Sequence, residues 1–190
     1  MKSNTRVYSF LIFLILSLTS FAQDTAVVKN NNIWINCGIG LSSFRSGDEF
    51  GPAMNFEISY EKNNALFSCR FVHNTEFVLF TSPAETVWDF GLLYGKIKKY
   101  AYGSASMSCG ISLIGGVRRG DYLSSSGSGW FSLGSNHDKR NFYNIGIPVE
   151  AQLFWTPTSV FGVGVSAFAN LNLDKPFYGT TLLLQLGNLK

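Results

Sequence analysis

Apolar residues alternate with mostly small or polar residues along two runs, residues 142–155 and 161–173, which a turn at Thr156–Ser159 separates. The apolar positions are Tyr143, Ile145, Ile147, Val149, Ala151, Leu153 and Trp155, then Phe161, Val163, Val165, Ala167, Ala169, Leu171 and Leu173. A period of two indicates β-strands, because successive side chains of a strand point to opposite faces. Each run is about twice as long as a typical globular strand. That length, together with one wholly apolar face, is typical of a strand that crosses a membrane.

Six further runs show the same alternation, so the chain holds eight predicted strands. The six lie at residues 33–42, 53–61, 65–73, 87–97, 102–115 and 177–187. Long connections at 43–52, 74–86 and 117–141 alternate with short ones at 62–64, 98–101 and 156–159, and only the last expected external loop, around Asp174, is short. An even number of antiparallel strands brings both termini to the periplasmic side of a barrel. The sequence therefore predicts an all-β protein, an eight-stranded antiparallel up-and-down transmembrane β-barrel.

The N-terminal segment has the features of a secretory signal peptide. Lys2 and Arg6 precede an apolar stretch at residues 7–18, and Ser20-Phe21-Ala22 fits a cleavage site. We expect a signal peptide at residues 1–22, a periplasmic lead-in at 23–32 and the barrel domain at 33–190.

Composition fits a barrel and excludes several other classes. Only 14% of the residues are charged, yet the mean hydropathy is just +0.12, which suits strands that are polar on one face. The net charge of +3 is too small to indicate nucleic-acid binding. The three cysteines, Cys37, Cys69 and Cys109, fall on apolar positions and cannot form a complete disulfide set. No spacing of cysteine or histidine predicts a metal site, and nothing indicates a cofactor.

Few charged residues fall on the inward positions. They are Glu57, Glu61, Arg70, Asp89 and Glu150. Asn63-Asn64 suits a two-residue type I′ turn, and that register places Glu57 directly opposite Arg70. We expect these two to form an ion pair in a narrow interior, with Asp89 and Glu150 extending the network and no other inward arginine or lysine competing. An eight-stranded barrel is just wide enough for side chains to fill, so the sequence predicts a plugged lumen.

Outward aromatic residues cluster near the strand ends. Tyr60, Tyr94, Trp155 and Phe161 are expected at the periplasmic ends, and Trp88, Tyr143 and Tyr178 at the external ends. Two aromatic girdles at the membrane interfaces follow from this placement. Pro148 lies in mid-strand, where a proline loses a ladder hydrogen bond, and predicts a β-bulge.

Some outer-membrane barrels are lipid-modifying enzymes that use histidine with serine and an acid. His73 and His137 are the only histidines, and no triad spacing is visible around either, so no catalytic residue is predicted. Arg118-Arg119 and Lys139-Arg140 flank the longest loop. They would suit contacts with lipopolysaccharide phosphates, although a solvated loop is the simpler explanation.

The stretch Gly146-Ile147-Pro148-Val149-Glu150-Ala151-Gln152-Leu153-Phe154, followed by Phe161-Gly162-Val163-Gly164 and Phe168-Ala169-Asn170-Leu171-Asn172, resembles the penultimate hairpin of the small outer-membrane β-barrel family. The architecture of the whole mature chain is similar to that of OmpA- and OmpX-like barrels. The resemblance implies location in the outer membrane of a Gram-negative bacterium. It also implies contacts with outer-membrane lipids and lipopolysaccharide, and insertion by the barrel-assembly machinery. The chain departs from the family at its last residues, which lack the usual terminal aromatic.

We therefore expect a non-enzymatic barrel with an envelope-structural or surface-binding role. No ligand of the external loops can be named from the sequence. The alternative from another class is a soluble lipocalin-like carrier of an apolar ligand, and a lipid-modifying enzyme is a lesser one. In a lipocalin the apolar face points inward and the outside is charged. Here the polar face carries many small residues suited to a narrow bore, which favours the membrane barrel.

Overall fold

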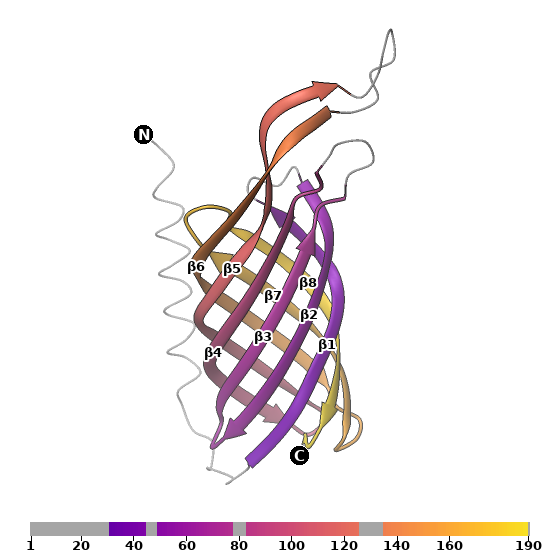
Figure 1. The fold of residues 1–190 in the computed structure, drawn as a ribbon. Helices are drawn as coiled ribbons and strands as arrows, with labels where there is room; N and C mark the ends of the chain where they lie inside the picture. The colour runs from indigo at the N-terminus through magenta and orange to yellow at the C-terminus, as the bar shows by residue number, and fades with distance from the viewer. Residues whose placement is uncertain (1–30, 45–48, 78–82, 126–134, 190) are drawn as a thin grey trace, which may run out of the picture.

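A computed structural model of the chain describes residues 31–44, 49–77, 83–125 and 135–189. These residues form eight antiparallel strands in one closed barrel, each paired with its neighbours in chain order and β1 with β8 (Figure 1). The strands are β1 Asn31–Phe44, β2 Glu49–Lys62, β3 Ala65–Thr75, β4 Thr86–Tyr100, β5 Gly103–Ser125, β6 Ser135–Trp155, β7 Phe161–Leu171 and β8 Phe177–Gly187. The predicted fold class and strand count are confirmed.

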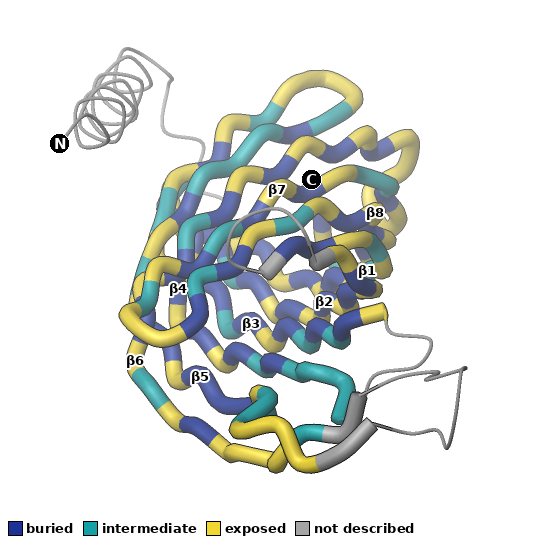
Figure 2. Tube along the Cα trace, turned by 90° about the horizontal axis from the view of Figure 1, so that it is seen from above, coloured by how far each residue is buried: buried dark blue, intermediate teal, exposed yellow. Residues whose placement is uncertain are grey.

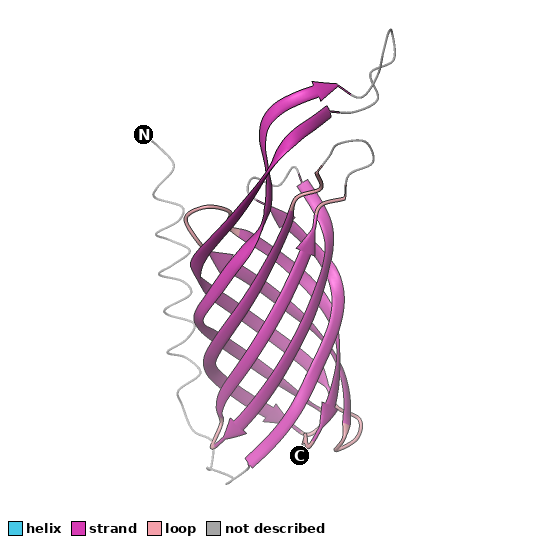
Figure 3. Ribbon diagram, viewed as in Figure 1, coloured by secondary structure: helices cyan, strands magenta, loops and turns pink. Residues whose placement is uncertain are grey.

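Strands account for nearly all of the described chain (Figure 3). No helix among the described residues is long and apolar enough to cross a membrane. The expected signal peptide, residues 1–22, and residues 23–30 of the expected lead-in lie outside the described residues. Asn31 and Asn32, assigned to the lead-in, already belong to β1, so the first strand begins two residues earlier than expected.

The two ends of the barrel differ. At the turn end lie the start of β1, the end of β8 and the short connections β2–β3, β4–β5 and β6–β7. At the loop end lie the other four connections. Three of them were expected to be long, but β1 extends to Phe44 and β2 begins at Glu49, so the β1–β2 connection is shorter than the expected 43–52. Asn63 and Asn64 at the turn end have positive φ values of 53° and 65°, as a type I′ turn requires. The expected register follows, with Lys62 opposite Ala65 and Glu57 opposite Arg70.

The β5–β6 hairpin is longer than expected. Residues 117–141 were expected to be a loop, but β5 continues to Ser125 and β6 begins at Ser135, so the hairpin rises beyond the other strands (Figure 1). The expectation was wrong because the serine, glycine and charged residues are poor strand formers by composition. The strands β5 and β6 nevertheless continue to pair with each other, with register shifts between Arg119 and Ser124.

Pro148 does not produce the expected bulge. The register of β5 with β6 is the same on both sides of it, with Cys109 opposite Val149 and Ser112 opposite Gly146. The ladder is only interrupted there, since proline has no N–H to donate.

At the seam that closes the barrel, Gly40 of β1 lies so near β8 that a Cβ would collide with the Thr180 carbonyl oxygen. Glycine therefore permits the close approach of the first and last strands.

Side chains sort oppositely on the two faces of the sheet. Exposed and buried residues alternate along the strands (Figure 2), and the exposed set is largely apolar. The buried set includes charged and amide side chains, among them Glu57, Arg70, Asp89 and Glu150, each at most 1% exposed. This is the reverse of the usual arrangement in a soluble protein, where charged residues are almost never fully buried unless paired.

Candidate functional site

The candidate site is the barrel interior, whose centre is an ionic network around Arg70. Its guanidinium lies 2.7 Å from Asp89 Oδ2 and 3.1 Å from Glu150 Oε2. Asn55 donates to the other oxygen of Glu150, at 3.2 Å. The Arg70 guanidinium carbon also lies 5.8 Å from the centroid of the Phe168 ring. Two ionic partners and a ring face hold the cation in place.

Glu57 is held separately. Its carboxylate accepts hydrogen bonds from Asn36 at 3.1 Å and from Ser59 at 2.9 Å, and a third from Gln152. The expected ion pair between Glu57 and Arg70 is therefore wrong, although their register is right. The Arg70 side chain instead meets Asp89 on β4, the strand on the other side of β3, and reaches Glu150 on β6, while Glu57 takes amide and hydroxyl donors.

A second inward cation was missed. Lys99 lies near the turn end of β4, and its Nζ is 2.7 Å from Glu61 Oε2. Asn32 of β1 donates to the same oxygen at 3.0 Å. The expectation that no inward lysine accompanies Arg70 is wrong because β4 was ended at residue 97, two positions too early to place Lys99 on the inward face. Continuing the alternation of β4 for two more residues would have placed Lys99 on the inward face.

Apolar layers lie on either side of the network. Toward the loop end, one cluster of buried residues consists of Ala53, Val72, Val87, Ile114, Phe142, Phe168 and Phe177. Toward the turn end, a second consists of Trp34, Leu66, Ile97 and Leu189. The polar centre is thus enclosed between two apolar layers.

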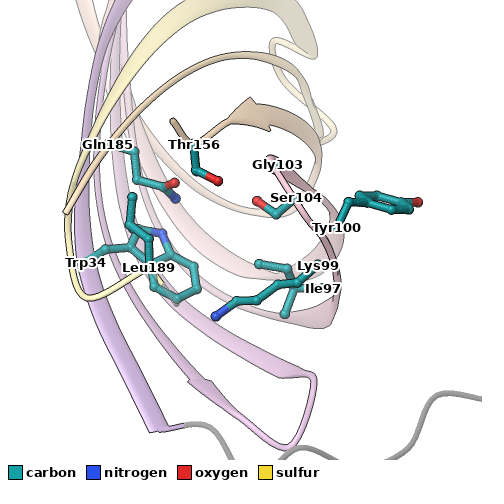
Figure 4. A pocket seen from close by; sticks show the side chains of 9 residues that line it. All are labelled: Trp34, Ile97, Lys99, Tyr100, Gly103, Ser104, Thr156, Gln185 and Leu189. Carbon is teal, nitrogen blue, oxygen red and sulfur yellow. The ribbon is translucent and has the colours of Figure 1, made fainter. Parts of the chain in front are cut away.

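The turn end holds a small cavity of about 30 Å³. Lys99, Trp34, Leu189 and Gln185 line it together with Thr156 and Ser104 (Figure 4). The Lys99 ammonium lies 6.0 Å from the Trp34 ring. The cavity has room for about one water molecule, and its lining is mixed, with the polar side chains of Lys99, Ser104, Thr156 and Gln185 beside apolar ones. It is too small for an organic ligand.

Ion pairs also join residues at the loop end. Arg119 of β5 pairs with Glu76, and its backbone N–H donates to Glu85 Oε1 at 2.8 Å. Lys175, in the β7–β8 connection, pairs with Glu85. All these carboxylates and cations are at least partly buried. The β3–β4 and β7–β8 connections are thereby tied to each other and to β5.

All seven aromatic residues expected in the girdles face outward. Tyr94, Tyr143, Trp155, Phe161 and Tyr178 are exposed, and Tyr60 and Trp88 are half-buried. Tyr60, Phe67 and Tyr94 form a row of rings with centroids 6.5 and 5.0 Å apart. Trp88 and Tyr143 meet edge to face at 6.1 Å. The structure thus places aromatics outward at both ends of the barrel.

No catalytic constellation appears among the described residues. His73 lies on the outward face of β3 opposite Trp88, and His137 lies on the hairpin with its ring 5.6 Å from that of Tyr122. No group of three or more potential metal ligands occurs in the described ranges. Cys37 and Cys109 are exposed free thiols, and Cys69 is a half-buried one. The interior offers a fixed charge network, and no nucleophile within it is paired with a histidine.

The comparisons with known proteins support the fold. No protein-family model matches the chain, and no curated protein matches it in sequence. Solved structures do match. Ail, the attachment invasion locus protein of Yersinia pestis, is 15% identical, with 83% of this chain and 98% of Ail covered and a TM-score of 0.56. Neisserial surface protein A is 10% identical, with 82% and 96% covered and a TM-score of 0.58.

A third match is the N-terminal β-barrel domain of Pseudomonas aeruginosa OprF, which is 11% identical, with 84% and 98% covered and a TM-score of 0.54. All three are small eight-stranded outer-membrane β-barrels. This chain has the fold of the small eight-stranded outer-membrane β-barrels. At these identities the likeness establishes the fold alone.

Proposed function

We propose that the chain is a non-enzymatic integral β-barrel of the outer membrane of a Gram-negative bacterium, exported through its signal peptide. The observation that supports this proposal is the sorting of side chains. Ile39, Leu182 and the other exposed large apolar residues of the strands are 39–76% exposed around the barrel wall, while acids and an arginine are buried inside. A continuous exposed apolar belt of this kind is a membrane contact. A lipocalin-like carrier needs the opposite arrangement, with an apolar cavity inside.

In this orientation the turn end is periplasmic and the loop end external. The outward aromatics then form the two interfacial girdles, since aromatic rings prefer the headgroup level of a bilayer. Outer-membrane lipids and lipopolysaccharide are the proposed partners of the wall, and the barrel-assembly machinery is the proposed partner during insertion. An envelope-structural or surface-binding role follows, with the β5–β6 hairpin as the element that projects farthest.

Full-length chain expressed in a Gram-negative host is expected in the outer-membrane fraction, processed after Ala22. It should migrate faster unheated than boiled, because a closed barrel stays compact in detergent. Fractionation, N-terminal sequencing and a heat-modifiability gel measure this together. Recovery as a soluble periplasmic protein would overturn the membrane assignment and would favour the lipocalin-like carrier instead.

We further propose that side chains plug the lumen. The support is the burial of the Arg70 network, the two apolar layers that enclose it, and the ion pairs of Lys175 and Arg119 at the loop end. Ions crossing such an interior would have to displace packed rings and break ion pairs. The refolded barrel is therefore expected to give no stable channel in planar bilayers, whereas large, long-lived single-channel currents would contradict the plug.

A further inference from the structure

Charged residues on the outer surface are distributed unevenly between the two ends of the barrel. Every described acid either faces the interior or lies at the loop end. The inward acids are Glu57, Glu61, Asp89 and Glu150, and those of the loop end are Glu49, Glu76, Glu85, Asp121, Asp138 and Asp174. At the turn end, the described charges on the outer surface are therefore all positive.

These positive charges are three exposed lysines on one side of the barrel, Lys62 at the end of β2 and Lys96 and Lys98 on β4. Ala65 of β3 lies opposite Lys62 on one side and Lys96 on the other, so these two lysines share a row, and Lys98 lies two residues farther along β4 toward the turn end. Strands are about 4.8 Å apart, which puts the Lys62 and Lys96 backbones about 10 Å from each other. One phosphate group lies within reach of two flexible lysine side chains at that spacing.

No acid in the described part of the chain neutralises this lysine patch. Glu61, the neighbour of Lys62 in sequence, faces the interior and is engaged by Lys99 and Asn32. The Lys98 ammonium lies 5.8 Å from the centroid of the Tyr100 ring. At the same end, the β6–β7–β8–β1 side presents Trp155, Phe161, Leu186 and Ile33, with no charge among its described outward residues.

The patch also lies at a defined depth. The ring row Tyr60–Phe67–Tyr94 precedes it on the same three strands, two residues nearer the middle of the barrel. Aromatic rings of this kind lie at the headgroup level, so the lysines just beyond them lie among the phosphates. Basic residues at that level attract anionic lipids by about 1 kcal/mol each.

We propose that Lys62, Lys96 and Lys98 form a binding surface for the headgroup of an anionic phospholipid in the periplasmic leaflet. It rests on the proposed membrane insertion and adds a preferred lipid on one side of the barrel, β2–β4. The alternative physical account is that the three lysines extend to any phosphate, including that of a zwitterionic lipid. The two accounts differ in whether net lipid charge matters.

The test places the photoreactive residue p-benzoylphenylalanine at Ala65, between the lysines, and in a second variant at Leu186 on the uncharged side. Full mature chain is incorporated into nanodiscs holding equal amounts of phosphatidylglycerol and phosphatidylethanolamine, and the cross-linked lipids are identified by mass spectrometry. The Ala65 probe is expected to capture phosphatidylglycerol at least about fivefold more often, the ratio that ~1 kcal/mol supplies. The Leu186 probe is expected to capture both lipids equally.

Replacing the lysines in the Ala65 variant with K62Q, K96Q and K98Q should bring its ratio close to one. The matched control removes three loop-end cations, with R118Q, K139Q and R140Q, and should leave the ratio unchanged. High salt should lower the preference, because screening weakens exposed charge pairs. Equal capture of the two lipids at Ala65, or a preference that survives the lysine replacements, would overturn the proposal.

Insertion is monitored in the same nanodisc samples by the heat-modifiability gel. Equal capture by an inserted barrel would therefore reject the lipid site alone, whereas failure to insert or to cross-link any lipid would reject the membrane assignment as well. In intact cells, an Ala65 adduct with a polypeptide in place of a lipid would also overturn the proposal.

Discussion

Arg70→Met is expected to lower the free energy of unfolding by about 3–5 kcal/mol, the cost of leaving buried charges without their partner. The guanidinium that it removes is the ionic partner of both Asp89 and Glu150, and all three side chains are shielded from solvent. Glu57→Gln should cost much less, about 1 kcal/mol, because Asn36 and Gln152 can still donate to an amide oxygen in place of Oε2, and the amide nitrogen in place of Oε1 can donate to the Ser59 hydroxyl.

Urea unfolding of the refolded barrel measures both losses. Arg118→Met is the matched control, since Arg118 is exposed and makes no ion pair among the described residues, and no measurable loss is expected. Double-mutant cycles give the sharper result: Arg70 should couple strongly to Asp89 and to Glu150, and weakly to Glu57. Coupling energies near zero for both acids would show that the interior is water-filled and that these pairs are screened.

The interior holds more acid than base, and neutral donors compensate for the difference. Arg70 serves Asp89 and Glu150, while Asn55 satisfies the second oxygen of Glu150. Glu57 has no cationic partner within the described ranges and instead receives amide and hydroxyl hydrogen bonds. Amide and hydroxyl donors thus take the place of cations at Glu57 and at the second oxygen of Glu150, so the asparagine and glutamine residues of the inner face are as much part of the network as the charged ones. Asp89 Oδ1 and Glu61 Oε1 have no donor among the described residues.

The strand count, the parity of each strand and the β2–β3 register could be predicted from the sequence. They depend on local signals: alternation with a period of two, and an Asn-Asn pair that tolerates positive φ. Parity alone also identified Glu57, Arg70, Asp89 and Glu150 as inward residues. These features can be inferred from the sequence without knowledge of any long-range contact.

The sequence placed Asp89 and Glu150 in the network, but which acids contact Arg70 directly could not be predicted, because these contacts depend on the shear and width of the closed barrel. Register places Glu57 beside Arg70, but side-chain length across the lumen decides that Arg70 meets Asp89 and Glu150. Lys99 was missed because a strand end is the least certain part of a pattern. The extended β5–β6 hairpin was missed because the pairing of β5 with β6 outweighs the weak strand propensity of the two segments.

The apolar layer toward the loop end gives the second large expected effect. Phe177 opens β8 and is 1% exposed, with its ring centroid 6.3 Å from that of Phe168. Phe177→Ala is expected to lower the free energy of unfolding by about 3–5 kcal/mol, because the mutation removes buried ring surface and leaves a cavity that rigid strands cannot close. Urea unfolding of the refolded barrel measures it.

The neighbouring residue provides the control. Tyr178 lies on the same strand, faces outward and is 52% exposed. Tyr178→Ala should cost clearly less than Phe177→Ala, since lipid or water fills the space that its ring leaves and no cavity term arises. Equal losses for the two variants would show that the inner layer is not closely packed and that the lumen is not plugged at this level.

Phe168 connects this layer to the ionic network, since its ring meets that of Phe177 edge to face and also lies under the Arg70 guanidinium. The losses in Phe177→Ala and Arg70→Met are therefore expected to be non-additive, because both changes release the same ring. A double variant that loses the full sum of the two single losses would mean that the layer and the network are independent. A smaller loss would show that rings and charges in the lumen pack as one unit.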